Sequence, residues 1–388
     1  MRAKAGELFA LAERDALAEW KLHLDSLPAC ADYVAAIVRQ RYPTLDVPFH
    51  ARWRHFVFAG RDLWRETAQD ASWRDQHTRA RAAFDLAITS VLLDAGAGPA
   101  WRFDDPNTDI VAARSEGLAL ASLRLFEWGG FSADPRDPLR ADAEALARLD
   151  AASLGDAFQV GPRNPLQGLD GRARLLNRLG QVIDARPDVF AREDTPRPGG
   201  LYDTLRARAL DNKLPARVIL DVLLDGLGDI WESRPRAFGV PLGDCWPTQN
   251  YGYVPLHKLS QWLAYSLIEP LQDAGIVVTE IDGLTGLAEY RNGGLFVDMG
   301  VLAPRDPDAL TLMHNVSDPL VVTWRSLTLA LLDRIAPLVR ERLGVTAEQF
   351  PLARVLEGGT WAAGRAIARE KRPDDGPPLL IHSDGTVF

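Results

Sequence analysis

Residues 253–301 hold the pair of side chains with the clearest capacity for acid–base chemistry. Lys258 lies at the start of an amphipathic stretch, and Glu289 stands beside Tyr290 and Arg291 further along. A lysine and a carboxylate brought together in a pocket can move a proton or stabilise a cation. The alternative is that Lys258 lies at the surface and that Glu289 forms an ion pair with Arg291.

Two segments in the first part of the chain combine charged and aromatic residues. In HARWRHF, His50 and Arg54 flank an indole, and the arginine fork suits a phosphate or carboxylate. In LLDAGAGPAWRF, Asp94 is followed by small residues that let a ligand approach closely, and then by Trp101. The alternatives are a loop that packs on a helix and a glycine C-cap that leaves Asp94 exposed.

Two further segments lie at expected helix starts. In RSEG, Ser115 is the predicted N-cap and Glu116 suits the first turn, although Arg114 or Glu116 facing a ligand is the alternative. In EGGTWAAGR, Trp361 and Arg365 are four residues apart and share a helix face. A helix N-terminus there can bind an anion, or the glycines can serve close helix packing.

Helical periodicity dominates the elements that must position these residues. Strands are predicted at Gly275–Ile281 and in a terminal hairpin of Pro378–Ile381 with Thr386–Phe388, whereas Leu295–Val301 fits a strand or a helix. The expected fold is mainly α with a small β component. Helices are expected at Ala80–Leu93, Arg114–Trp128, Leu205–Trp231, Leu256–Leu271, Leu320–Leu343 with a kink or break at Pro337, and Val355–Lys371.

Two segments rich in proline, glycine and charge, Asp134–Leu139 and Ala185–Gly200, indicate linkers. They predict an N-terminal helical lobe over residues 1–135, a linker and insertion over 136–200, and a C-terminal helical lobe over 201–388. We expect the two lobes to share one active-site cleft.

Composition excludes several classes of protein. The net charge of −9 argues against a nucleic-acid partner. Two cysteines form neither a disulfide framework nor a CxxC pair, and no metal-binding motif is present. The acidic N-terminal segment is not a signal peptide, and no apolar run is long enough for a membrane span. We therefore expect a cytoplasmic protein with no cofactor, no metal and no membrane contact.

Long motifs in order resemble the uracil-catabolism protein-four family, a family of unknown function from the uracil-catabolism route of fungi and bacteria. They are VPFHARWRHF, LLDAGAG with WRF, RSEGLALAS, NPLQGLDGR, GDCW, PLHKLSQWLAYSLIEPL, EIDGLTGLAEYRNGGLFVDMGVL, EGGTWAAGR and SDGTVF. In that route the pyrimidine ring is thought to be opened to a ribosylurea. The resemblance implies a protein that releases urea and a sugar from it.

A second resemblance, over HKLSQWLAYSLIEPL and EIDGLTGLAEYR, is to the queuosine-salvage nucleosidases, which are similar to helix-hairpin-helix DNA glycosylases. Their lysine corresponds to Lys258, and their aspartate before a Tyr-Arg pair corresponds to Glu289. Glutamate replaces aspartate here, and Asn-Gly-Gly follows Tyr-Arg in place of a proline-containing stretch. This resemblance implies a helix-hairpin-helix glycosylase-like core.

Together the resemblances imply a metal-independent N-glycosidase that acts on a ribosylated urea or another nucleoside-derived molecule. Glu289 would stabilise the cationic sugar, Asp94 would be the second carboxylate, and Lys258 would orient Glu289 or assist departure of the urea nitrogen. The expected binding residues are Arg291, Arg54 and Arg365 for a phosphate, Tyr290, Trp101 and Trp246 for the pocket wall, and His50, Arg114, Glu116 and Trp361 around it. The alternatives are an amidohydrolase acting on the ureido carbonyl, and a non-catalytic partner of the ring-opening cyclohydrolase-like protein. Contact with other uracil-catabolism enzymes is a further expectation.

Overall fold

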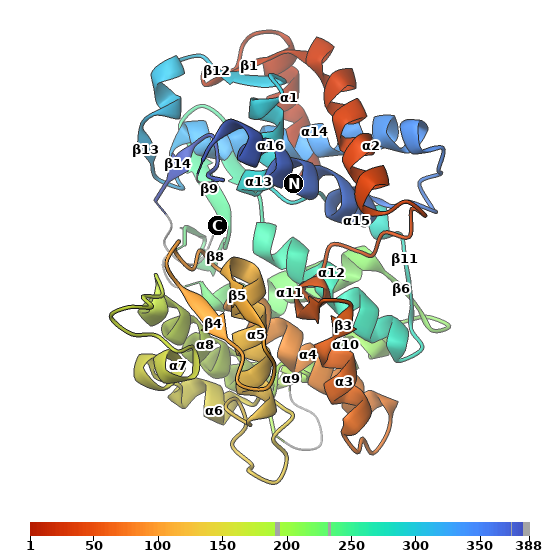
Figure 1. Cartoon of the computed structure of the whole chain (residues 1–388), viewed down its shortest axis with the longest axis vertical. Helices are drawn as coiled ribbons and strands as arrows, with labels where there is room; N and C mark the ends of the chain where they lie inside the picture. The colour runs from red at the N-terminus through yellow and green to blue at the C-terminus, as the bar shows by residue number, and fades with distance from the viewer. Residues whose placement is uncertain (191–194, 232–233, 374, 383–388) are drawn as a thin grey trace. The chain divides into compact units, whose positions relative to one another are not determined.

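The computed structural model describes residues 1–190, 195–231, 234–373 and 375–382, and these residues form a mainly α-helical protein (Figure 1). Strands in the described part of the chain occur as two-stranded pairs, so the predicted class, mainly α with a small β component, is confirmed. The chain divides into two compact units. Unit 1 holds residues 1–50, 234–261 and 281–382, and unit 2 holds residues 51–190, 195–231 and 262–280. The division predicted near residues 135 and 200, and the helix-hairpin-helix core, stay predictions.

Unit 1 is built around one long helix, α14, which has an almost entirely buried first half. Its Trp324 stacks on Trp20 with ring centroids 6.4 Å apart, and the Trp324 indole donates to the carbonyl of Gly293 at 3.1 Å. An added Cβ at Gly293 would lie 2.7 Å from the same indole, so a larger residue would push α13 away from α14. The helices of unit 1 are α1 (Arg2–Glu13), α2 (Leu27–Arg41), α13 (Tyr290–Asp298), α14 (Pro319–Leu343), α15 (Leu352–Arg354), the π-helical turn η6 (Val355–Thr360) and α16 (Trp361–Lys371).

Short strand pairs and 3₁₀ turns connect the helices of unit 1. Helix α12 (Lys258–Asp273) begins in unit 1 and continues into the residues of unit 2. The antiparallel pairs are β1 (Trp20–Leu22) with β12 (Leu302–Pro304), β7 (Arg236–Ala237) with β8 (Val240–Pro241), and β9 (Cys245–Thr248) with β10 (Gly252–Pro255); β13 (Met313–His314) pairs with β14 (Leu380–Ile381) in parallel. The 3₁₀ turns are η1 (Leu24–Ser26), η4 (Ile281–Gly283) and η5 (Pro307–Leu310).

Unit 2 is organised around α4 and α5, which pack side by side (Figure 1). Residues 82–93 are all buried, so this part of the chain is a core helix rather than an amphipathic one. The helices of unit 2 are η2 (Arg52–Phe56), α3 (Leu63–Asp70), α4 (Gln76–Leu92), α5 (Arg114–Glu127), α6 (Ala143–Arg148), α7 (Ala151–Ala157), α8 (Leu169–Ala185), α9 (Pro187–Phe190), α10 (Gly200–Arg208), α11 (Ala216–Leu227) and η3 (Gly228–Ile230). The strand pairs are antiparallel β2 (Val57–Phe58) with β3 (Arg61–Asp62), antiparallel β4 (Arg102–Asp104) with β5 (Val111–Ala113), and parallel β6 (Lys213–Pro215) with β11 (Val277–Thr279).

Several predicted elements are confirmed. Helices occupy Ala80–Leu93, Leu256–Leu271 and Leu320–Leu343 to within a few residues, and β11 lies inside the strand expected at Gly275–Ile281. The ambiguous segment Leu295–Val301 begins within helix α13. Residues 386–388 of the predicted terminal hairpin lie outside the described part of the chain, whereas Leu380–Ile381 pairs with β13.

Three expectations are corrected. Leu205–Trp231 is not one helix, because a turn with left-handed Asp211 and Asn212 and the strand β6 separate α10 from α11. Ser115 is not the N-cap of α5; the helix begins at Arg114 and its cap is Ala113. Helix α14 is not broken at Pro337 and continues to Leu343, while a kink there stays a prediction. None of the helices described is long and apolar enough to cross a membrane.

Candidate functional site

Glu289 is a buried carboxylate held at the start of a helix in unit 1. As the N-cap of α13 it accepts hydrogen bonds from the backbone N–H groups of Arg291 at 2.7 Å and Asn292 at 2.5 Å. The residue is only 6% exposed. Burial raises the pKa of Glu289, while the two backbone hydrogen bonds and the charges of Lys258 and Arg291 oppose that rise. A carboxylate has about four acceptor positions, so the two N–H bonds leave capacity for a substrate or water.

Asp244 and Arg325 fix the two segments that carry Lys258 and Glu289. The carboxylate of Asp244 accepts the backbone N–H of Lys258 at 3.0 Å and two bonds from the Arg325 guanidinium at 2.8 and 2.7 Å. Arg325 then donates its Nε to the carbonyl of Ala288 at 2.9 Å, immediately before Glu289. One ion pair therefore connects the first residue of α12 to the residue that precedes the N-cap of α13.

The aromatic and basic neighbours of this carboxylate also have defined places. The guanidinium of Arg291 lies 4.8 Å from the centroid of the Tyr290 ring and donates to the carbonyl of Asp375 at 2.7 Å. Its predicted ion pair with Glu289 is not among the contacts of the described residues, where Glu289 bonds to backbone N–H groups instead. The indole of Trp246 donates to Asp244 at 2.8 Å, so this tryptophan belongs to the same network.

A second buried acid of unit 1, Glu357, lies on the π-helical turn η6. It bonds to Nδ1 of His50 at 2.6 Å, and both side chains are less than a tenth exposed. The His50 ring lies 5.5 Å from the indole of Trp361. Thr360 of the same turn donates to the Asn292 amide oxygen at 2.7 Å, so η6 is tied to the beginning of α13. Single π-helical turns inside α-helices occur frequently at functional sites.

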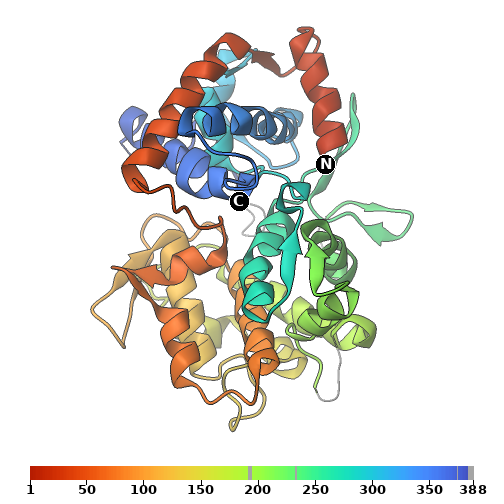
Figure 2. The ribbon, with the colours of Figure 1, turned by 90° about the vertical axis from the view of Figure 1, so that its right-hand side faces the viewer.

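The glycines of the EGGTWAAGR segment serve close packing. Added Cβ atoms at Gly358 and Gly359 would lie 2.9 Å from the side chains of Val47 and Val34, respectively. Figure 2 shows α2 beside the dark-blue helices that include η6. Because η6 continues directly from α15 into α16, Trp361 is not at a free helix N-terminus. The guanidinium of Arg365 lies 4.9 Å from the Trp361 ring, which confirms that the two residues share a face.

Asp94 lies in unit 2 just after α4, and its side chain is 7% exposed. It pairs with the fully buried Arg52, with Nη1 and Oδ2 3.2 Å apart. Glu116 in the first turn of α5 acts on the same arginine and raises its pKa, which burial lowers overall. Arg114 begins α5 and is exposed. Asp94 is therefore buried in an ion pair with Arg52 rather than exposed at the end of the helix.

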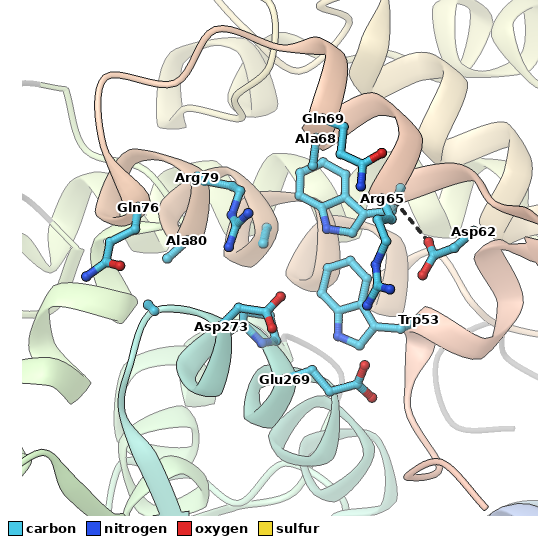
Figure 3. Close-up of a pocket in the computed structure, with 14 residues that line it drawn as sticks. Trp53, Asp62, Arg65, Ala68, Gln69, Gln76, Arg79, Ala80, Glu269 and Asp273 are labelled. Carbon is cyan, nitrogen blue, oxygen red and sulfur yellow. Dashed lines mark hydrogen bonds between the residues drawn. The ribbon is translucent and has the colours of Figure 1, made fainter. Parts of the chain in front are cut away.

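Trp101 and Arg54 occupy other parts of unit 2. Trp101 is fully buried, stacks on Phe158 and donates to its carbonyl at 3.0 Å, which is the contact pattern of a core residue. Arg54 bonds to Glu269, which lines a cavity of about 300 Å³ between α3, α4 and α12 (Figure 3). Figure 3 shows the indole of Trp53 and the carboxylates of Glu269 and Asp273 on the wall of this cavity.

The fold and these contacts define a mainly helical protein with buried carboxylates next to lysine, arginine and histidine in unit 1. The chain belongs to the family described as "Protein of unknown function (DUF1688)", whose model matches residues 1–388. It is 38% identical over 401 residues to "Protein urg3" of Schizosaccharomyces pombe, covering 100% of this chain and 96% of the relative. It is 37% identical over 410 residues to "Uracil catabolism protein 4" of Lachancea kluyveri, covering 95% of this chain and 92% of the relative.

Sequence reasoning passed over four residues that the structure makes prominent. Glu357, Asp244 and Arg52 lie inside segments that were singled out, but none of the three was chosen as a site residue. Asp244 stands in GDCW, where a lone aspartate carries no spacing signal. Arg325 lies among apolar residues in the first half of a long helix. A charged residue at such a position indicates a buried ion pair, and this was the signal in the sequence.

Proposed function

We propose that the protein acts in uracil catabolism and hydrolyses the bond between ribose and the nitrogen of a ribosylurea-type molecule. Its similarity to a relative named for uracil catabolism supports the pathway. The observation that carries the chemistry is Glu289, a buried carboxylate fixed by two backbone N–H groups and influenced by the charge of Lys258. Cleavage of an N-ribosidic bond passes through an oxocarbenium-like state, which a nearby carboxylate stabilises.

In this proposal the bond between C1′ and nitrogen breaks, and its electron pair stays on the nitrogen. Lys258 supplies a proton to that nitrogen or holds Glu289 in place, and Glu289 stabilises the positive charge on the sugar. A water molecule then attacks C1′ and passes its proton to the neutral Lys258 amine left by the first step, or to Glu289, so that urea and ribose leave. Arg291 and Arg365 are the candidate contacts for a phosphate on the sugar, since a guanidinium matches a phosphate oxygen pair.

The assay uses the purified, chelator-treated protein with ribosylurea and with its 5′-phosphate, and measures urea and reducing sugar. Wild type is expected to release both products from one of the two compounds. Glu289→Gln is expected to lower the rate by about 100- to 1,000-fold, the range for loss of one electrostatic stabiliser. Lys258→Ala tests the second residue of the pair.

Glu269→Gln is the matched control, because it also removes a carboxylate paired with an arginine but lies outside the residues assigned here. Thermal unfolding of each variant separates loss of chemistry from loss of fold. No release of sugar from either compound by wild type would refute the glycosidase proposal. Release of ammonia without sugar would instead show attack on the ureido carbonyl.

A further inference from the structure

The ion pair between Arg52 and Asp94 in unit 2 is held from one side by hydrogen bonds that leave its other side unused. Nε of Arg52 donates to the Ser90 hydroxyl at 2.7 Å, and Nη1 donates to the carbonyl of Ser115 at 3.3 Å. Nη1 also lies 3.2 Å from Oδ2 of Asp94 and 3.3 Å from Nδ1 of His55. These contacts fix the guanidinium without involving its second terminal nitrogen.

Two polar atoms of this pair, Nη2 of Arg52 and Oδ1 of Asp94, are buried and have no hydrogen-bond partner among the described residues. The Arg52 side chain is 0% exposed and that of Asp94 is 7% exposed. An unsatisfied buried polar atom lowers the stability of the fold, and more so when it is charged. Native structures contain few such atoms, and two in one ion pair call for a third group that binds both.

The backbone that carries Asp94 is held in place by a second buried arginine. The buried guanidinium of Arg172 donates to the carbonyls of Leu93 at 2.9 Å, Ala95 at 2.8 Å and Gly96 at 3.2 Å. It therefore binds the backbone on both sides of Asp94. The fixed donor and acceptor are a preorganised arrangement of the kind that binding sites use.

We propose that Arg52 and Asp94 form a binding subsite for a small, neutral, planar group that carries a carbonyl beside an N–H, such as an amide or a ureido group. The carbonyl accepts from Nη2 of Arg52, and the N–H donates to Oδ1 of Asp94. Each unused atom shares a carbon with one of the two atoms that lie 3.2 Å apart in the ion pair, which limits how far apart the unused atoms can be. A neutral ligand fits because the charges of the pair already cancel.

The guanidinium carbon of Arg52 also lies 5.7 Å from the centroid of the Trp262 ring, a cation–π contact that helps to hold the guanidinium in place. The subsite is derived from contacts within unit 2 alone. It therefore stands whether or not Glu289 cleaves a ribosyl bond.

The test measures binding of labelled 2-imidazolidinone, a rigid cyclic urea, to the full-length protein by equilibrium dialysis. Its comparison compound is 1,3-dimethyl-2-imidazolidinone, which keeps the carbonyl and lacks both N–H groups. Wild type is expected to bind the first compound saturably and the second at least about tenfold more weakly, since a hydrogen bond to a charged group is worth about 1.5–3 kcal/mol.

Asp94→Asn keeps the shape of the side chain but can turn its amide N–H₂ outward, so the subsite then presents two donors and a net positive charge. This variant is expected to bind 2-imidazolidinone about 10- to 100-fold more weakly than wild type does. It is also expected to gain affinity for acetate, which has two acceptor oxygens. The gain distinguishes an altered subsite from an unfolded one. Glu269→Gln is the control and is expected to bind like wild type.

Three results would overturn the proposal. They are absence of saturable binding to wild type, equal binding of the dimethyl compound, and unchanged selectivity in Asp94→Asn. Any of them would mean that an ordered water, rather than a ligand, fills the bonds of Nη2 and Oδ1.

Discussion

Replacing Asp244 by asparagine tests whether one ion pair holds the Lys258 and Glu289 segments together. The change keeps an oxygen acceptor for the backbone N–H of Lys258 but removes the negative charge that Arg325 faces. The Arg325 side chain is 1% exposed and that of Asp244 is 15% exposed, so water cannot replace the lost charge. We expect a destabilised unit 1 and a large loss of any activity that depends on Glu289.

The magnitude follows from the burial of the partner that remains. Removing one member of a buried ion pair typically lowers the free energy of unfolding by about 3–5 kcal/mol, because an uncompensated charge stays buried. The retained amide oxygen places Asp244→Asn near the lower end of that range. The exposed pair of Arg186 and Asp188, with side chains 31% and 64% exposed, supplies the comparison. Asp188→Asn is expected to change the free energy of unfolding far less than Asp244→Asn does, because water screens an exposed pair.

Guanidinium-induced unfolding, followed by circular dichroism and tryptophan fluorescence, measures both variants. The double variant Asp244→Asn with Arg325→Met should be more stable than Asp244→Asn alone, because it also removes the stranded charge. A destabilisation by Asp244→Asn no larger than that of Asp188→Asn would refute the reasoning. So would a double variant that is no more stable than Asp244→Asn alone.

The same pair predicts a pH dependence with a definite sign. Burial opposes ionisation of Asp244, but the charge and hydrogen bonds of Arg325 outweigh it and hold the pKa of Asp244 below its ordinary value. A lowered folded-state pKa stabilises the protein above the unfolded-state value of about 3.9, and the contribution is lost as the pH falls from there toward the folded-state value. Asp244→Asn should therefore flatten the acid limb of the stability profile.

Two further predictions concern packing and thiol chemistry. Gly364→Ala should lower the free energy of unfolding by about 1–3 kcal/mol, because its Cβ would lie 2.1 Å from the backbone oxygen of Arg291. An added Cβ at Gly6 in α1 meets nothing within 4 Å, so Gly6→Ala should be neutral or stabilising. Guanidinium unfolding of the two variants decides between them, and equal stability would contradict the packing argument. Burial raises the pKa of Cys30 to about 12 and that of Cys245 to about 11, so iodoacetamide at about pH 8 should modify neither thiol in the native protein and both after unfolding. Mass spectrometry reads this out, and rapid alkylation of the folded protein would refute it.

The helices were predictable where hydrophobic periodicity or a long apolar run was decisive. Residues 82–93 are all buried, and their apolar run gave the position of α4 to within a few residues. The segment Leu205–Trp231 was mispredicted because its periodicity continues across a turn, although Asp211-Asn212 and Pro215 were local signals of a break. Left-handed backbone at two such residues is common in turns, yet a single sequence does not show that it occurs.

The sequence was sufficient to predict which segments carry the candidate site, but not which side chains of those segments contact one another. The residue types of Glu289 and Lys258 first indicated this pair, and a resemblance assigned their roles. The structure places both in unit 1, where the charge of Lys258 acts on Glu289. The role of Glu289 as an N-cap was not predicted, because serine, threonine, aspartate and asparagine are the usual caps. The links through Asp244 and Arg325 join residues far apart in the chain, and no local pattern encodes such pairs.

The buried ion pairs of this protein differ in how many of their polar atoms form hydrogen bonds. That difference distinguishes pairs that hold the fold together from pairs that could bind a ligand. In the pair of Asp105 with Arg124, both carboxylate oxygens accept from the guanidinium, at 2.7 and 2.8 Å, and the Thr108 hydroxyl adds a further bond. Asp244 is similarly saturated by Arg325, Trp246 and Lys258. A saturated pair has no capacity left for a ligand, so its role is to hold the chain.

Asp94 is different, because its Oδ1 is the one buried carboxylate oxygen in the described part of the chain that lacks a hydrogen-bond partner. An uncompensated buried acceptor lowers stability, and neighbouring Arg52 adds a second cost of the same kind. Arg172 holds the backbone around Asp94, yet both atoms remain without a hydrogen bond. The loss of stability is therefore concentrated at this one ion pair. A ligand that bonds to both atoms removes this loss of stability when it binds. The ligand selectivity of the Asp94→Asn variant is therefore a sharper test of function than the change in its stability.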